Sequence, residues 1–132
     1  MQTAKSSGFG TILVDSSGHT LYMLTTDSPT SPACTASCLN IWLPLRSTAA
    51  PKAGSGVSPS LLGTVTRSDG TRQVSYNGHL LYTFSEDSAK GQVNGERISS
   101  FGGTWYVLNA AGTPVTAPVS SSTTTTSGGN GY

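Results

Sequence analysis

Residues 10–28 of this chain recur without a gap as residues 70–88. Nine of the nineteen aligned positions are identical, and the matches include His and Tyr, which are scarce here. A further match, at a slightly longer offset, places Trp-Leu-Pro-Leu of residues 42–45 over Trp-Tyr-Val-Leu of residues 105–108. The identical pairs are Gly10/Gly70, Thr11/Thr71, Val14/Val74, Gly18/Gly78, His19/His79, Leu21/Leu81, Tyr22/Tyr82, Asp27/Asp87 and Ser28/Ser88. In a chain of 132 residues, this predicts one domain built from two related units of about sixty residues.

The composition argues against a helical protein. Ser, Thr, Gly and Pro together make up nearly half of the residues, and all four are poor helix formers. Charged residues are only 10% and the formal net charge is +1, which argues against nucleic-acid binding, a polybasic membrane anchor and an acidic interaction tail. No apolar run approaches the roughly 18 residues of a transmembrane helix.

Both copies contain the β-branched runs and turn signals of antiparallel strands. Asn77-Gly78 is the strongest hairpin signal, because both central residues of a type I′ turn need positive φ. The expected strands are residues 11–14, 19–24 and 41–45 in the first copy, and 63–67, 73–76, 79–84, 104–108 and 113–115 in the second. We expect an all-β fold of two pseudo-symmetric antiparallel units, each closed by its own Trp-bearing strand. Such units form a small sandwich or barrel, with at most one short helical turn near residues 34–39.

The organisation along the chain follows from the repeat. We expect an N-terminal lead-in at residues 1–9, unit 1 at 10–46, a connector at 47–60, unit 2 at 61–117 and a low-complexity tail at 118–132. The tail is rich in Ser, Thr and Gly and has almost nothing apolar to bury, so in an isolated molecule it is expected to be disordered. Its β-branched threonines are also good strand formers, so the alternative is that it adds as a strand to a neighbouring copy.

The two cysteines, Cys34 and Cys38, are separated by three residues. On a helical turn this spacing places both thiols on one face, near the separation that a disulfide needs. Together with the low charge and the many Ser and Thr residues, which suit an exported protein, it favours a structural disulfide. Free or redox-active thiols and a metal site are the alternatives, although neither a Cys-x-x-Cys motif nor a zinc-finger spacing is present.

The repeated His-x-Leu-Tyr segment carries the candidate site residues. Side chains alternate along a strand, so Tyr22 and Tyr82 are expected in the core, each packed near its unit's Trp, Trp42 or Trp105. Asp27 and Asp87 follow these tyrosines by five residues and are expected to accept the buried hydroxyl or to cap the following loop. As an alternative, a pseudo-two-fold axis would bring His19 and His79 together as ligands of a metal or haem.

Signals of catalysis are poor. The chain has no Gly-x-Ser-x-Gly, no His-Glu-x-x-His and no glycine loop that cradles a phosphate ahead of a helix. Adjacent carboxylates occur only at Glu86-Asp87, and side chains at successive strand positions point to opposite faces. We expect no enzyme and no required cofactor.

Several of these residues resemble a known family. Tyr82-Thr83-Phe84-Ser85-Glu86-Asp87 is similar to the Tyr-x-[Phe/Trp/Tyr]-x-x-Asp signature of bacterial predicted lipoproteins, which are secreted repeats of unknown function. The first copy, Tyr22 to Asp27, has Leu24 where the signature has an aromatic residue. The Cys pair followed by residues 42–45, and residues 101–107, also resemble the family. The similarity covers about residues 8–112 and supplies no catalytic residue.

The resemblance implies an exported or cell-surface bacterial protein with tandem repeats. Residues 1–7 have no apolar segment of a signal peptide, so we expect that a leader has been removed and that Met1 stands in its place. The lipobox cysteine of a lipoprotein is absent, which indicates that either an anchor was removed with the leader or this member is secreted. The function that we expect is a structural or interaction module without catalysis, with cell-envelope components or copies of itself as partners. The alternatives are an extracytoplasmic metal- or haem-binding protein using His19 and His79, and a surface polymer assembled by strand addition.

Overall fold

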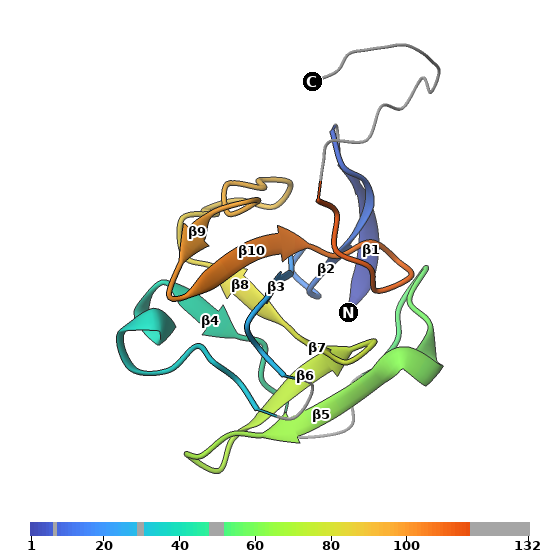
Figure 1. Ribbon diagram of the computed structural model, residues 1–132. Helices are drawn as coiled ribbons and strands as arrows, with labels where there is room; N and C mark the ends of the chain where they lie inside the picture. The colour runs from blue at the N-terminus through green and yellow to red at the C-terminus, as the bar shows by residue number, and fades with distance from the viewer. Residues whose placement is uncertain (7, 29–30, 48–51, 117–132) are drawn as a thin grey trace.

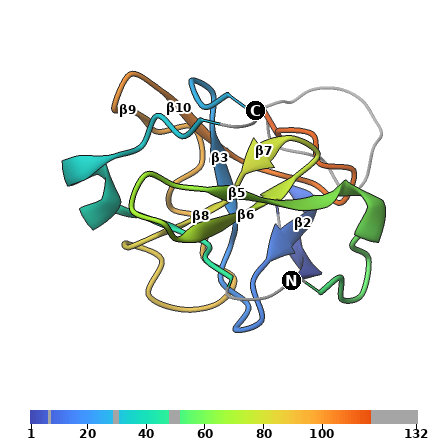
Figure 2. The ribbon, with the colours of Figure 1, turned by 90° about the horizontal axis from the view of Figure 1, so that it is seen from below.

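The structure, a computed structural model, describes residues 1–6, 8–28, 31–47 and 52–116. In these ranges the chain forms strands with two 3-10 turns, as the composition predicts (Figure 1). The elements are β1 (Gln2–Ser6), β2 (Gly10–Val14), β3 (Tyr22–Leu24), η1 (Ala36–Asn40), β4 (Trp42–Pro44), η2 (Pro59–Leu61), β5 (Leu62–Thr66), β6 (Arg72–Tyr76), β7 (His79–Leu80), β8 (Tyr82–Phe84), β9 (Ser99–Ser100) and β10 (Gly103–Val107). They make a two-stranded sheet, a three-stranded sheet and a central five-stranded sheet, which curl around a common interior (Figures 1 and 2).

The central sheet carries the pseudo-two-fold relation between the copies. Its strand order is β4-β8-β3-β10-β9, and Tyr22 of β3 lies directly opposite Tyr82 of β8. On either side of this pair, the Trp strand of each unit pairs with the Tyr strand of the other unit: Trp42 lies opposite Phe84, and Trp105 opposite Leu24. The expectation that each unit is closed by its own Trp strand therefore differs from the structure. The two units exchange their closing strands.

The outer hairpins repeat the same pattern. β1 pairs with β2, and β5 pairs with β6, which turns at Asn77-Gly78 into β7. Both turn residues have positive φ (51° and 79°), which confirms the predicted type I′ hairpin. β1 lies within residues 1–9, so the segment expected to be a lead-in contributes a strand equivalent to β5.

The core lies on both faces of the central strands. Tyr22 and Leu24 point into one cluster of buried side chains and Leu21 and Met23 into another, as alternation along a strand requires. A strand that is buried on both faces is fixed in register, because a slip by one residue would exchange the two sets of side chains.

The connector between the units is partly ordered against the first hairpin. The N–H of Thr3 in β1 donates a hydrogen bond to the Ser55 carbonyl at 3.1 Å, and the N–H of Gly54 donates to the Met1 carbonyl. Val57 is buried in the second cluster. The predicted disorder of the tail concerns residues 118–132, which lie outside the described residues. Within the described part of the chain, no helix has the length and apolarity needed to cross a membrane.

Candidate functional site

The motif residues converge on a stack of two tryptophans. The rings of Trp42 and Trp105 lie nearly parallel, at an interplanar angle of 2° and a centroid distance of 3.8 Å. Tyr22 meets Trp42 edge-on at 5.3 Å, and Tyr82 meets Trp105 edge-on at 5.0 Å. All four side chains are at most 1% exposed. This confirms that the two tyrosines occupy equivalent places, each beside the Trp of its own unit.

Phe84 makes the stack asymmetric. Its ring stacks on Trp42 at 4.2 Å, whereas the equivalent position in the first copy is Leu24, opposite Trp105. The stack therefore has three rings in the order Phe84, Trp42 and Trp105, and the first copy supplies the aliphatic Leu24 where the second copy supplies Phe84. Both arrangements fill the space between the strands, so Leu24 is compatible with the same core.

The first Tyr–Asp pair joins the two units. The Tyr22 hydroxyl donates to Oδ2 of Asp87 at 2.6 Å and accepts the Gly95 N–H at 3.1 Å. The other carboxylate oxygen of Asp87 accepts the N–H of Asn94. Burial, followed by the bond to Asp87, raises the pKa of Tyr22 far above its ordinary value, so this phenol stays protonated. Asp87 therefore both accepts a tyrosine hydroxyl and holds its loop, but the tyrosine belongs to the other copy.

Gly95 sets how closely this loop approaches the stack. A Cβ at position 95 would lie 2.6 Å from Cη2 of Trp42 and 3.0 Å from Cζ of Tyr22. Only a residue without a side chain brings its N–H to the Tyr22 hydroxyl over the Trp42 ring. The sequence offered no signal for this role, because Gly95 lies in a segment with several turn-forming residues.

The second Tyr–Asp pair has a different environment. Arg67 is 5% exposed and donates to the side-chain oxygen of Gln73 and to the Cys34 carbonyl. The Tyr82 hydroxyl lies among Arg67, Gln73 and Asp27, but in the described residues it makes no hydrogen bond of good geometry. Burial raises the pKa of Asp27, opposed by the N–H of Ala33, by Tyr82 and by the charge of Arg67. The Tyr22 hydroxyl is thus hydrogen-bonded to Asp87, whereas the Tyr82 hydroxyl lies near the buried guanidinium of Arg67.

The two tyrosine hydroxyls should therefore differ in their contribution to stability. Tyr22→Phe leaves the Asp87 carboxylate and the Gly95 N–H without their partner, and should lower the free energy of unfolding by about 1.5–3 kcal/mol. Tyr82→Phe removes a buried hydroxyl that lies beside Arg67, Gln73 and Asp27 without a hydrogen bond of good geometry, and should cost less, under about 1 kcal/mol. Urea denaturation of both variants is the measurement. Equal losses would contradict the asymmetry between the two pairs.

Glu96 is a second buried carboxyl beside the first pair. Its Oε1 accepts the N–H of Val107 at 2.7 Å, whereas its Oε2 is buried without a partner in the described residues. Burial raises its pKa to about 7, although the bond from Val107 and the charge of Arg97 oppose the shift. The sequence analysis did not single out Glu96, because a lone acid in a polar loop carries no local signal of burial.

This carboxyl should make stability depend on pH. The folded state binds the Glu96 proton more tightly than the unfolded chain, whose ordinary pKa is 4.5. The stability it contributes is therefore fully present below pH 4.5 and is lost as the pH rises through about 7. Glu96→Gln should remove this part of the profile of unfolding temperature against pH. His79, whose pKa is lowered by burial, acts in the opposite sense, so the difference between parent and variant is the quantity to measure. Superimposable profiles would contradict the role of Glu96.

Cys34 and Cys38 form a disulfide, as predicted from their spacing. Both cysteine side chains are buried in the same core cluster as Trp42. The 3-10 turn η1 begins at Ala36, between the two cysteines, within the segment where a helical turn was expected. The bond encloses only three residues and holds the loop that leads into β4. No free cysteine occurs in the chain as described.

Two stretches of the chain, residues 3–46 and 63–109, match the model of a family described as a secreted repeat of unknown function. Together they cover more than half of the protein. The chain belongs to this secreted-repeat family. No curated protein and no solved structure matches it. The two matches coincide with the two interlocked units, and the first includes β1, so the outer hairpin is part of each repeat.

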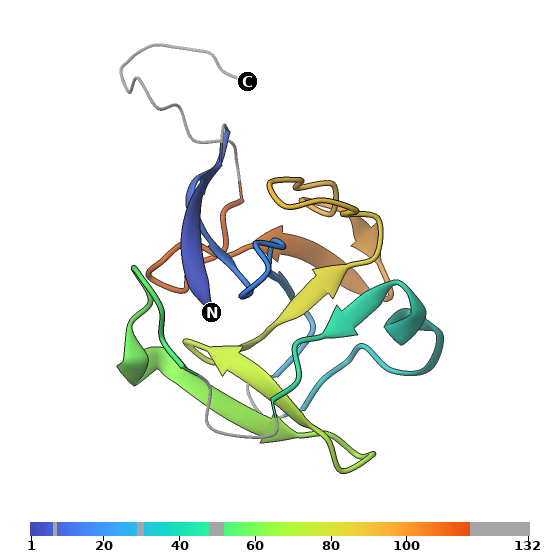
Figure 3. The same cartoon turned by 180° about the vertical axis from the view of Figure 1, so that it is seen from behind.

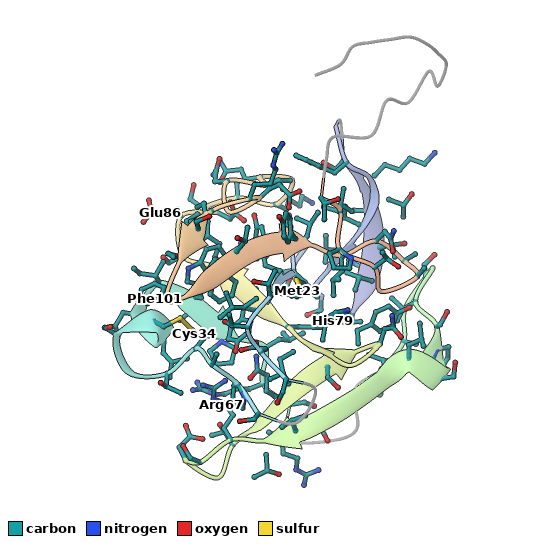
Figure 4. All side chains as sticks on the ribbon, viewed as in Figure 1. Met23, Cys34, Arg67, His79, Glu86 and Phe101 are labelled. Carbon is teal, nitrogen blue, oxygen red and sulfur yellow. A yellow bond between two sulfur atoms is a disulfide. The ribbon has the colours of Figure 1, made fainter. Side chains whose placement is uncertain are left out.

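The histidines shared by the two secreted repeats lie apart. Because Tyr22 faces Tyr82 in an antiparallel pair, the chain runs back to His19 on one side of this pair and back to His79 on the other. Nδ1 of His19 lies 3.8 Å from the Asp15 carboxylate, and His79 is half-buried at the start of β7 (Figure 4). Within the described ranges, no three His, Cys, Asp or Glu side chains form a group that could hold a metal.

Proposed function

We propose that this secreted-repeat protein is a structural or interaction module that acts outside the cytoplasm, on bacterial cell-envelope components or on copies of itself, without catalysis and without a cofactor. One observation carries the proposal: a tyrosine and an aspartate of the family motif, one from each repeat, bond to each other across the pseudo-two-fold axis inside the core. The Tyr22 hydroxyl and the Asp87 carboxylate are engaged with each other and with backbone N–H groups, so this pair locks the repeats together. The buried disulfide supports an oxidising location.

Retention on bacterial cell envelopes tests the module directly. Labelled protein is mixed with isolated envelopes, and bound protein is measured as a function of concentration. Material released from the envelopes is followed by mass spectrometry over hours. The expected result is saturable retention with no chemical change in the envelope material. Time-dependent release of new products would show an enzyme, and the absence of saturable retention would contradict cell-envelope components as the partner.

The absence of a cofactor is tested on the same natively purified protein. Metal analysis and a visible absorption spectrum should show neither a stoichiometric metal nor a haem band. A metal or haem that is lost in a His19→Ala or His79→Ala variant would replace the proposal by the alternative in which these histidines are ligands. The antiparallel pairing of Tyr22 with Tyr82 directs the chain toward His19 and toward His79 in opposite directions, which favours the proposal without a cofactor.

Self-assembly by strand addition is a second candidate function. It is favoured by one observation, the outer edge of β5, whose backbone groups have no partner among the described residues.

A further inference from the structure

β5 is an edge strand with its outer hydrogen-bonding groups unpaired. Two hydrogen bonds mark the ends of the pairing between β5 and β6. At one end the N–H of Asn77 donates to the Leu61 carbonyl, and at the other the N–H of Arg67 donates to the Thr71 carbonyl. Because bonding alternates along an antiparallel strand, the odd-numbered residues of β5 bond to β6 and Thr64 and Thr66 point their N–H and C=O groups outward. In the described chain these four groups have no partner. Both side chains are exposed, and β5 forms the lower rim of the molecule, outside β6 (Figure 1).

The other long edges of the molecule are protected. β1, the equivalent of β5 in the first copy, points the N–H of Thr3 outward, and the connector covers it through the Ser55 carbonyl (Figure 3). β1 also carries Lys5, a residue type that discourages edge pairing. β4 points the outward groups of Trp42 and Pro44 away from β8, and Pro44 has no N–H to offer. β9 is only two residues long. β5 has five residues with neither a charge nor a proline.

We propose that the outer edge of β5 accepts a strand from a second copy of this chain, and that residues 120–126 of that copy are the donor. This inference rests on the proposed function. It names a second copy of the chain as the partner and the outer edge of β5 as the binding surface. The donor would exchange main-chain hydrogen bonds with Thr64 and Thr66. Each copy then has one donor and one acceptor, so the contact is head-to-tail and propagates into a polymer.

The chain itself points to this donor. Sixteen residues follow Thr116, the last described residue, and none of them is charged. Among them, four consecutive threonines match the β-branched, uncharged character of β5 and provide Thr–Thr pairs across the new strand pair. The described chain reaches Thr116 beside β10, where the Val115 N–H donates to the Val107 carbonyl, and β5 belongs to the separate three-stranded sheet.

Two blocked variants and a mixture test the proposal on the full-length chain. Thr64→Pro removes an outward N–H and leaves the bonds from β5 to β6 intact, and Thr64→Ala is its matched control because it keeps the N–H. The double substitution Thr124→Pro and Thr125→Pro blocks the donor in either register, because adjacent residues point their N–H groups to opposite sides. Sedimentation velocity from micromolar to millimolar concentration measures assembly. Urea denaturation checks that each variant is folded.

The parent and Thr64→Ala are expected to form a concentration-dependent series of oligomers, and each blocked variant alone to stay monomeric. An equimolar mixture of the two blocked variants should form a closed pair, because one retains the donor and the other the acceptor. A parent that stays monomeric, oligomers that persist in either folded blocked variant, or a mixture that stays monomeric would each overturn the proposal. Envelope retention is measured on the same samples. Retention of the parent without assembly overturns this inference alone, whereas a parent that is neither retained nor assembled contradicts the proposed function.

Discussion

Trp105→Ala is expected to lower the free energy of unfolding by about 3–5 kcal/mol, a large part of the total stability of a domain of this size. Trp105 is fully buried, and its ring lies between Trp42 and the edge of Tyr82, so the substitution leaves a cavity at the pseudo-two-fold axis. Trp42→Ala should cost a similar amount for the same reason. Urea denaturation followed by far-UV circular dichroism is the measurement, because the fluorescence of the variants is altered by the loss of the indole itself.

The double variant shows whether the two rings act together. Because Trp42 and Trp105 stack on each other, the second substitution removes a contact already lost, and the double variant should cost about 0.5–1.5 kcal/mol less than the sum of the single variants. Leu43→Ala is the control, since Leu43 lies on β4 beside Trp42 but is 47% exposed. Strict additivity, or losses no larger than that of Leu43→Ala, would contradict a shared core stack.

Arg67→Met is expected to destabilise the protein by about 3–5 kcal/mol. Methionine fills a similar volume but leaves the Gln73 side-chain oxygen and the Cys34 carbonyl without a donor, and Asp27 without its nearby positive charge. The loss should be larger at pH 8 than at low pH, because the penalty falls once Asp27 is protonated. Thermal and urea unfolding at both pH values measure it.

Arg46→Met is the matched control. Arg46 is half-exposed and lies 3.8 Å from the exposed Asp69, and water screens such a surface pair, so its loss should change the free energy of unfolding little. If Arg67→Met behaves like Arg46→Met, the buried guanidinium is not needed to hold the loop of Cys34 against the second hairpin.

Much of the local structure could be predicted from the sequence. Most strand positions, the Asn77-Gly78 turn and the disulfide follow from short-range rules: β-branched alternation, the need for positive φ, and a spacing that joins two thiols across one turn. The exceptions include β1, which was expected to be a lead-in, and residues 113–115, which form only an isolated bridge. The burial of both tyrosines beside the tryptophans also follows, because duplicated sequence keeps duplicated packing.

Arg67, Glu96 and Gly95 could not be identified in this way. A cation after a strand and an acid or a glycine in a polar loop are ordinary surface residues by every local criterion. Only the close approach of these segments to the aromatic stack makes Arg67 a buried donor, shifts the pKa of Glu96 and excludes a side chain at Gly95.

The sequence by itself determined that the protein is a duplicated β domain with a disulfide and an aromatic core, because each of these depends on residues close together in the chain or on their repetition. Only the tertiary structure decided that the repeats are interlocked. Trp105 faces Leu24 and Trp42 faces Phe84, and Tyr22 bonds to Asp87. Each copy offers an equivalent Tyr strand, Trp strand and Asp, so pairing within a unit and pairing between units have the same sequence pattern. Which of the two pairings forms depends on the relative placement of the two units in the folded protein, and local sequence preferences do not determine that placement.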